Sequence, residues 1–200
     1  MSARDLIAYV NGGEMGRVSQ SARGRLQFTY ADEWLRSQAA FPLSLSMPLQ
    51  AAPHAHPKIE AFLWGLLPDS ASILRSWGRR FQVSARNPFA LISHVGEDCA
   101  GAVQFVRPER LAELHAQRRG NVAWLSESEV GQRLLDLRTD HAAWRSIRDK
   151  GQFSLAGAQP KTALLFENGR WGVPSGRTPT THILALLQFL WVKIDHFLIN

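Results

Sequence analysis

A chain of 200 residues with 45% hydrophobic residues, seven Trp and ten Phe can bury a sizeable core, which excludes an intrinsically disordered protein. Its formal net charge of +6 leaves two interpretations open: an anionic partner (nucleic acid, a nucleotide or an acidic protein) or an ordinary basic surface. The lone Cys99 excludes an internal disulfide and the N-terminus shows no signal peptide, so we expect a cytoplasmic protein.

Strands are predicted over the first 50 residues. The apolar run 6–10 ends at Asn11-Gly12, and a second apolar run covers 15–18. This pattern predicts a hairpin, because a type I′ turn needs a positive φ at both central residues and Asn-Gly tolerates it. Apolar and polar residues alternate over 26–30, as in a strand with one buried face. The segment 41–49 alternates too, but its two prolines cannot donate to a neighbouring strand, so it is predicted to be an edge strand or an extended loop.

The next stretch predicts three helices and a returning strand. The first helix closes at Pro68, while Asn87-Pro88 supplies the N-cap and first position of the third, which ends at Gly96. The run 102–106 is predicted to return to the sheet, which completes a compact α+β unit. The apolar positions that predict the first two helices are Ile59, Phe62, Leu63, Leu66, Leu67, Ile73, Leu74, Trp77 and Phe81.

The second half of the chain predicts helices followed by another hairpin. Residues 107–120 are rich in Arg, Glu and Gln, which favours a solvated helix or connector. Ser126 and Glu129 form a capping box before a further apolar helix pattern. Apolar residues flank Asn168-Gly169, so a second hairpin is predicted over 163–173.

The segment 151–184 is the most informative for chemistry. It begins with a Gly/Ala/Ser-rich loop that carries Ser154 and leads into the second hairpin. Such a loop can direct backbone N–H groups at phosphate oxygens. A Walker A loop is excluded, because Pro160 rather than Gly precedes Lys161-Thr162. From the residues alone, a phosphate-binding loop and a generic loop before a hairpin both remain open.

Several phrases resemble, in the right order, the HipA-type serine/threonine kinases, the toxin halves of bacterial toxin–antitoxin pairs. The most specific are SLAGAQPKTALL at 154–165 and PSGRTPTTHIL at 174–184. The resemblance continues upstream through YADEWLRSQAAFPLSLSMPLQ at 30–50, LLPDS at 66–70 and RNPFALISHVGEDCAGAVQF at 86–105. The chain is therefore identified as similar to this family over roughly residues 5–184.

The resemblance implies an α+β fold: a small mixed, barrel-like sheet with packed helices, followed by an incomplete antiparallel sheet of a kinase N-lobe. The implied parts are an N-terminal subdomain over 1–107, a helical connector over 108–150, the start of the kinase-like N-lobe over 151–184 and a divergent apolar tail over 185–200. For the family it implies ATP and Mg²⁺ as cofactors and a protein serine, typically on an aminoacyl-tRNA synthetase, as substrate. It also implies a HipB-type helix-turn-helix antitoxin as partner, with operator DNA reached through that antitoxin.

The resemblance also implies roles for individual residues. Ser154 matches the serine that the family autophosphorylates. Phosphorylation adds about two negative charges to a loop that covers ATP phosphates, so ejection of the loop is the switch we expect. A serine that only relieves strain in a tight loop is the alternative. The phosphate loop, by the same resemblance, consists of Ser154, Ala156, Gly157, Ala158, Gln159, Lys161 and Thr162.

The chain departs from the family pattern at two points. The family places a Lys directly after TTHI(L/I) to hold the ATP phosphates, and here Ala185 follows Leu184. After residue 153 the only acidic residues are Glu167 and Asp195, too few for a catalytic Asp and ligands of Mg²⁺. We therefore expect no catalytic residue, no metal site, no productive binding of Mg²⁺-ATP and no kinase activity by this chain alone.

The tail 185–200 is apolar, but Lys193 and Asp195 interrupt it, so no membrane anchor is expected. A foreign or out-of-frame end of a truncated gene is our hypothesis for it. Three functions stay open. The first is the N-terminal portion of a HipA-type kinase toxin. The second is a non-catalytic antitoxin-binding module, or part of a split kinase whose missing lobe a separate chain supplies. The third is a degraded gene product.

Three other groups of reactive residues are interpreted as structural. His54 and His56 have no Cys or acidic cluster with them, so a proline-flanked surface loop is favoured over a metal site. Asp69 and Ser70 fit an ordinary helix start. A hydrolase site is not favoured, because no nucleophile-elbow motif accompanies its candidates. Those candidates are His94, Glu97, Asp98 and Cys99.

Overall fold

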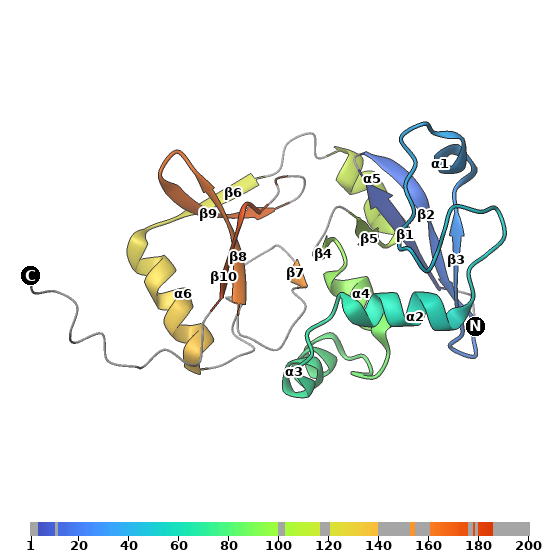
Figure 1. The fold of residues 1–200 in the computed structure, drawn as a ribbon. Coiled ribbons are helices and arrows are strands. Elements are labelled where there is room, and N and C mark those ends of the chain that lie inside the picture. The colour runs from blue at the N-terminus through green and yellow to red at the C-terminus, as the bar shows by residue number, and fades with distance from the viewer. Residues whose placement is uncertain are drawn as a thin grey trace, which may run out of the picture.

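The computed structural model describes residues 4–10, 12–99, 103–116, 121–139, 153–154, 161–175, 178 and 180–185. Figure 1 shows two sheets, each with its own helices, and a short strand pair between them. Both larger sheets are four-stranded and entirely antiparallel. The predicted α+β class is therefore confirmed.

The first sheet has the strand order β3-β2-β1-β5. The hairpin predicted around Gly12 is present: Val10 pairs with Gly13, and Gly12 has φ 92°. A register shift between Ala8 and Tyr9 marks a bulge in the first strand. The strands are β1 (Arg4–Val10), β2 (Gly13–Gln20), β3 (Leu26–Tyr30) and β5 (Gln104–Val106).

Helices cover this sheet and enclose the core. In Figure 1, α2 and α4 lie against one face of the sheet, and α3 lies below them. Fully buried side chains from strands and helices meet there, which include Leu6, Phe28, Ile59, Leu63, Leu91 and Phe105. The helices of this unit are α1 (Asp32–Arg36), α2 (His56–Gly65), α3 (Ala71–Phe81), α4 (Pro88–Val95) and α5 (Pro108–Ala116).

Both predicted ends of α4 are confirmed, but the glycine at its C-terminal end is needed for close packing rather than for a positive φ. The Asn87 side chain accepts a hydrogen bond from the Ala90 amide at 3.1 Å, and Pro88 occupies the first position. Gly96 does not have a positive φ. A Cβ there would lie 2.6 Å from the Ile92 carbonyl and 2.7 Å from the Phe105 Cβ, so close packing requires the glycine.

The segment 41–49 is an extended loop rather than a strand, with a single bridge between Ser44 and Met47. Tyr30 fixes it: the Leu43 amide donates to the Tyr30 hydroxyl at 2.7 Å, and that hydroxyl donates to the Met47 carbonyl at 2.5 Å. Burial raises the pKa of Tyr30, so the phenol stays protonated and can donate. The loop holds Leu45 in solvent with 95% of its surface exposed.

The second sheet has the strand order β10-β8-β9-β6. Its predicted hairpin is confirmed, with Asn168 at φ 50° and Gly169 at φ 74° between the paired Glu167 and Arg170. The strand β6 was not predicted: it lies within 108–150, for which only helices were expected, and it pairs with β9. The elements are β6 (Asn121–Leu125), α6 (Glu127–Thr139), β8 (Lys161–Glu167), β9 (Arg170–Ser175) and β10 (His182–Ala185).

A two-stranded parallel pair connects the two halves of the sequence. It joins β4 (Asp98–Cys99), directly after α4, to β7 (Phe153–Ser154). The tail 186–200 lies outside the described residues. None of the helices in the described part combines the length and apolar character that crossing a bilayer requires.

Candidate functional site

The backbone of Ser154 lies beside the N-terminal half of the molecule. In the parallel pair, Ser154 is opposite Cys99 and Phe153 is opposite Asp98. Figure 1 shows β7 between the two larger sheets. The four loop residues predicted to follow it, Ala156 to Gln159, lie outside the described residues. The structure thus positions the start of the candidate phosphate loop through its backbone, next to the end of α4.

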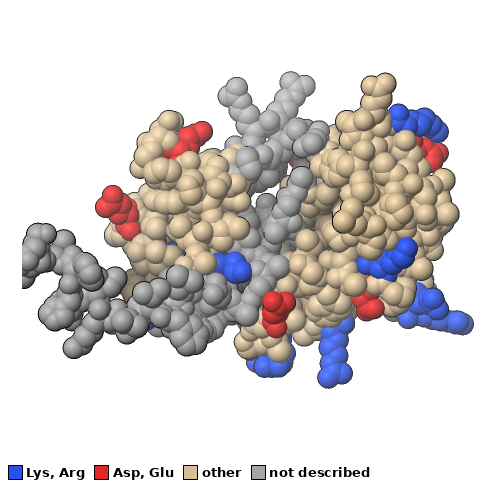
Figure 2. Space-filling model, in the orientation of Figure 1, with Lys and Arg blue, Asp and Glu red and all other residues tan. Residues whose placement is uncertain are grey.

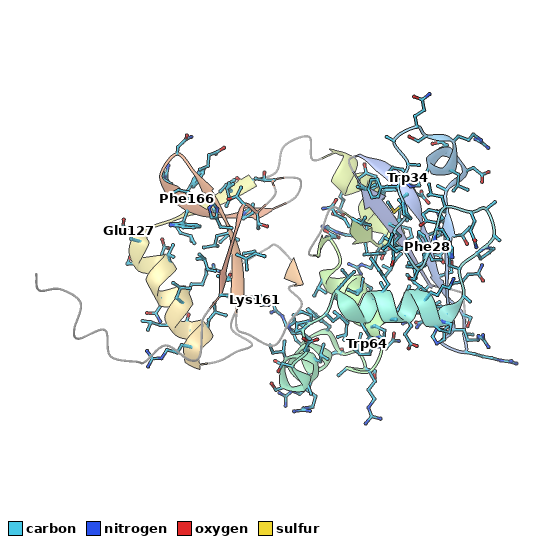
Figure 3. The ribbon with its side chains drawn as sticks, in the orientation of Figure 1. Phe28, Trp34, Trp64, Glu127, Lys161 and Phe166 are labelled. Carbon is cyan, nitrogen blue, oxygen red and sulfur yellow. The ribbon has the colours of Figure 1, made fainter. Side chains whose placement is uncertain are left out.

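The far end of the candidate loop enters β8 at Lys161 and Thr162. Thr162 is buried, with 2% of its surface exposed, and Lys161 is half-buried at the lower end of β8, where Figure 3 labels it. In the pairing with β10, Lys161 is directly opposite Ala185. Because directly opposed residues of an antiparallel pair point to one face, Lys161 and Ala185 share a face of this sheet.

The segment TTHIL, residues 180–184, joins β10 to β8. The Phe166 amide donates to the Thr181 hydroxyl at 2.8 Å, and the Thr181 amide donates to the Leu164 carbonyl at 3.0 Å. His182 packs edge-on against Phe166 and Trp171, with ring centroids 5.6 and 5.3 Å away. Sequence reasoning did not assign these contacts, and they show that Thr181 and His182 hold an outer strand in place.

The expected lack of productive Mg²⁺-ATP binding stays a prediction, on which the pairing of Lys161 with Ala185 bears. Lys161 brings a cationic group to the face of the second sheet that it shares with Ala185, whose side chain is a methyl group. Within the described part of the chain, no group of three or more His, Cys, Asp or Glu side chains could hold a metal ion. Glu167 lies at the hairpin turn, paired with Arg170.

Two of the hydrolase candidates, Glu97 and His94, make contacts within the N-terminal unit, while the side chains of Asp98 and Cys99 lie outside the described part of the structure. Glu97 is held by Arg110, with its two carboxylate oxygens 3.0 and 3.1 Å from the guanidinium, and this hydrogen bonding raises the pKa of Arg110. The ring of His94 stacks on that of Phe81, with the ring centroids 4.6 Å apart. Burial, and then the charge of Arg107, lower the pKa of His94, so its imidazole is neutral near pH 7. His94 also lines a cavity of about 430 Å³.

The two early histidines are structural, but the prediction of a surface loop is wrong for His54. This residue is 2% exposed; its backbone bridges Phe28, and its ring Nε2 lies 2.9 Å from the Pro48 carbonyl. The Nδ1 of His56 accepts a hydrogen bond from the Leu26 amide at 3.0 Å, and its Nε2 lies 3.3 Å from Glu60. These ring nitrogens are therefore already engaged within the protein.

Comparison with known proteins identifies the N-terminal unit. Residues 6–106 match the family model described as the HipA N-terminal domain. A putative kinase of Sinorhizobium fredii is 33% identical over 188 residues, which cover 92% of this chain and 43% of the relative. The serine/threonine-protein kinase toxin HipA of Shewanella oneidensis is 32% identical over 174 residues, 84% of this chain and 36% of the relative.

The fold also matches a solved HipA structure. The Shewanella oneidensis complex of HipA, HipB and operator DNA contains a chain that superposes with a TM-score of 0.68 at 27% identity. The match covers 93% of this chain and 41% of that chain. This chain spans about two fifths of the length of the relatives that it matches. It belongs to the HipA family and carries the HipA N-terminal domain.

Proposed function

We propose that the chain is the antitoxin-facing part of a HipA-type toxin, with a HipB-type helix-turn-helix antitoxin as its protein partner. The observation that carries the proposal is the match of residues 6–106 to the HipA N-terminal domain. It is supported by the resemblance of 93% of the chain to a HipA solved together with HipB and operator DNA. The sheet and helices of this unit enclose a buried core, so it offers a folded surface to a partner.

Co-expression with the cognate HipB-type helix-turn-helix antitoxin tests the proposal. We expect the tagged chain to co-purify with that protein as a stoichiometric complex on size-exclusion chromatography. A helix-turn-helix antitoxin from an unrelated toxin–antitoxin pair is the matched control and should not be retained. A folded chain that does not co-purify with this antitoxin would refute the binding function. A chain that is insoluble under all conditions would instead support the degraded-gene alternative.

The second part of the proposal concerns phosphoryl transfer. In a complete HipA-type kinase, the sheet β10-β8-β9-β6 would belong to the N-lobe, Ser154 would be autophosphorylated, and a protein serine, for example on an aminoacyl-tRNA synthetase, would receive the γ-phosphate of ATP. We expect these 200 residues to perform no such transfer alone. The support for this is the pairing of Lys161 with Ala185 instead of a second lysine, and the scarcity of carboxylates after Ser154.

A nucleotide titration tests this expectation separately from antitoxin binding. The melting temperature of the purified chain should not change with Mg²⁺-ATP, whereas binding of the antitoxin should raise it. The substitution Ala185→Lys provides a comparison, because it restores an ammonium group opposite Lys161. A saturable shift in the unsubstituted chain, or transfer of label from γ-labelled ATP to Ser154, would contradict the expected inactivity.

A further inference from the structure

The cavity beside His94, within the N-terminal unit, has no role in the proposed function. Its volume of about 430 Å³ lies within the range of about 300–1,000 Å³ that small-molecule sites occupy. The start of β1, the helix α4 and the junction between β5 and α5 supply most of its lining. Because Ile7 pairs with Val106 in an antiparallel register, Arg107 lies beside the start of β1. The apolar walls are formed by Leu6, Val83, Phe89, Ala90 and Pro108.

The guanidinium of Arg107 lines this cavity with its hydrogen-bonding capacity unused. Its Nε is buried and has no hydrogen-bond partner among the described residues. The Glu109 carboxylate lies 3.7 Å from its Nη1, which is longer than a hydrogen bond. By contrast, the guanidinium of Arg110 donates to both carboxylate oxygens of Glu97. A buried donor without an acceptor destabilises a protein, so Arg107 indicates a partner from outside the chain, either water or a ligand.

The imidazole of His94 is a second unused polar group in the lining. Phe81 fixes the orientation of this ring by stacking on it, with the two ring planes 2° apart. Within the described part of the chain, its nitrogens form no hydrogen bond. The lowered pKa of His94 keeps the ring neutral near pH 7, so it offers one N–H donor and one acceptor nitrogen. The other histidines whose side chains are described all use a ring nitrogen within the protein: His54, His56 and His182.

The charges around the cavity favour a ligand with a single negative charge. Arg4 and Arg107 supply two cations to the lining, and Asp5 and Glu109 supply two carboxylates. Asp5 is already paired with Arg17 at 3.6 Å, so it does not call for a cationic ligand. A dianionic phosphate would be repelled by these two carboxylates. A planar carboxylate carries half that charge and matches the guanidinium of Arg107, which can donate two parallel hydrogen bonds to it.

We propose that this cavity binds a small organic monocarboxylate with an apolar body. The carboxylate accepts hydrogen bonds from Arg107 and from the N–H of His94, and the apolar body packs against walls that include Phe89. This inference goes beyond the proposed function, which assigns a protein partner and no small-molecule ligand. On the face that Figure 2 shows, the Lys and Arg side chains of the N-terminal unit lie at separate places rather than in one patch. A small anion held in a cavity therefore fits this unit better than a polyanion held on its surface.

Saturation-transfer NMR of the purified full chain with hydrocinnamate, a phenyl-substituted monocarboxylate, tests the proposal. We expect saturable binding of hydrocinnamate and none of its neutral amide, which has the same apolar body. Arg107→Gln should weaken binding by about tenfold or more, because it removes the charged donor. Arg107→Lys should fall between the two, since lysine keeps the charge but not the planar fork. The matched control is Arg36→Gln, which removes the same charge from an exposed position of α1 outside the cavity and should bind as the parent does.

The protonation of His94 gives a second readout. A bound carboxylate stabilises the imidazolium, so the pKa of His94, followed by its ring-proton resonances, should rise when hydrocinnamate is added. By linkage, hydrocinnamate should bind more tightly at pH 6 than at pH 8, and His94→Gln should lose this difference. Other charged groups near this ring are those of Arg107, Arg4, Asp5 and Glu109 in the lining, and Arg80, which lies over Phe81. Equal binding of the amide, equal loss in Arg36→Gln, a preference for inorganic phosphate or no saturable binding would each overturn the proposal.

Discussion

The two four-stranded sheets of this protein differ in how completely they are covered. In the N-terminal unit, helices α2 and α4 cover the sheet, and even Phe28 on the edge strand β3 is fully buried. In the second unit, large apolar side chains on three strands remain exposed, with Trp124 at 37%, Phe166 at 39% and Ile183 at 59%. Both units bury a core, which in the second unit includes Leu137, Leu164 and Val173, but among the described residues it is the strands of the second sheet that expose large aromatic side chains. We expect stability to be concentrated in the first unit.

The largest expected effect is on the free energy of unfolding, when one phenylalanine from each sheet is replaced by alanine. Phe28→Ala removes a fully buried ring that contacts Tyr30 at 4.8 Å, and should lower the free energy of unfolding by about 3–5 kcal/mol. Phe166→Ala removes a partly exposed ring packed on Trp171 at 4.5 Å and should cost about 1 kcal/mol. Urea unfolding followed by circular dichroism measures both. Equal losses would mean that the second sheet is covered in solution.

A smaller effect on stability is expected when either of two glycines is replaced by alanine. Gly96→Ala places a methyl group against Phe105 and the Ile92 carbonyl and should destabilise the fold by about 1–3 kcal/mol. Gly131→Ala, in the interior of α6 with no atom within 4 Å, should instead stabilise by up to about 1 kcal/mol, because alanine is the better helix former. Thermal unfolding of the two variants should therefore shift in opposite directions. A stabilising Gly96→Ala would show that the packing around α4 relaxes easily.

The smallest effect is a pH dependence that belongs to the first unit alone. Burial and the charge of Arg107 hold the pKa of His94 below its ordinary value, so the unfolded chain binds a proton more readily there than the folded chain does. The resulting stabilisation is complete above the unfolded pKa of about 6.5 and declines as the pH falls towards the lower, folded pKa. Urea midpoints at pH 8 and 5.5 should differ more for the unsubstituted chain than for His94→Gln. An identical pH dependence would assign the effect to other groups.

Features with local causes could be predicted from the sequence. The turn at Asn168-Gly169 depends on the φ angles of two residues, and the start of α4 depends on Asn87 and the proline after it. The strand β6 could not be predicted, because its exposure does not alternate and its pairing with β9 spans a long stretch of chain. His54 was placed at the surface because the residues of β3 that bury it, Phe28 and Tyr30, are distant in the sequence.

Part of the candidate site could likewise be predicted from the sequence, and part of it could not. Its residue types were identified by resemblance to a family motif. The hairpin was predicted to begin at Ala163, whereas the strand already begins at Lys161, so Lys161 and Thr162 lie in β8 and not in the loop. The position of Lys161 opposite Ala185 depends on the register between β8 and β10, which no local pattern encodes. The pairing of Ser154 with Cys99 could not be predicted either, because strands of two residues are too short to show a periodic pattern in the sequence.

The parallel pair of β4 with β7 also has a consequence for biosynthesis. Its strands are about 55 residues apart in the sequence. At a translation rate of about 5–20 residues per second, β4 leaves the ribosome roughly 3–11 seconds before its partner exists. Helix α4 and the sheet before it can fold during that interval, so the serine-bearing segment docks onto a surface that is already formed. Until then the edge of β4 is available to any other extended chain, which makes this interval the period of greatest exposure to mispairing.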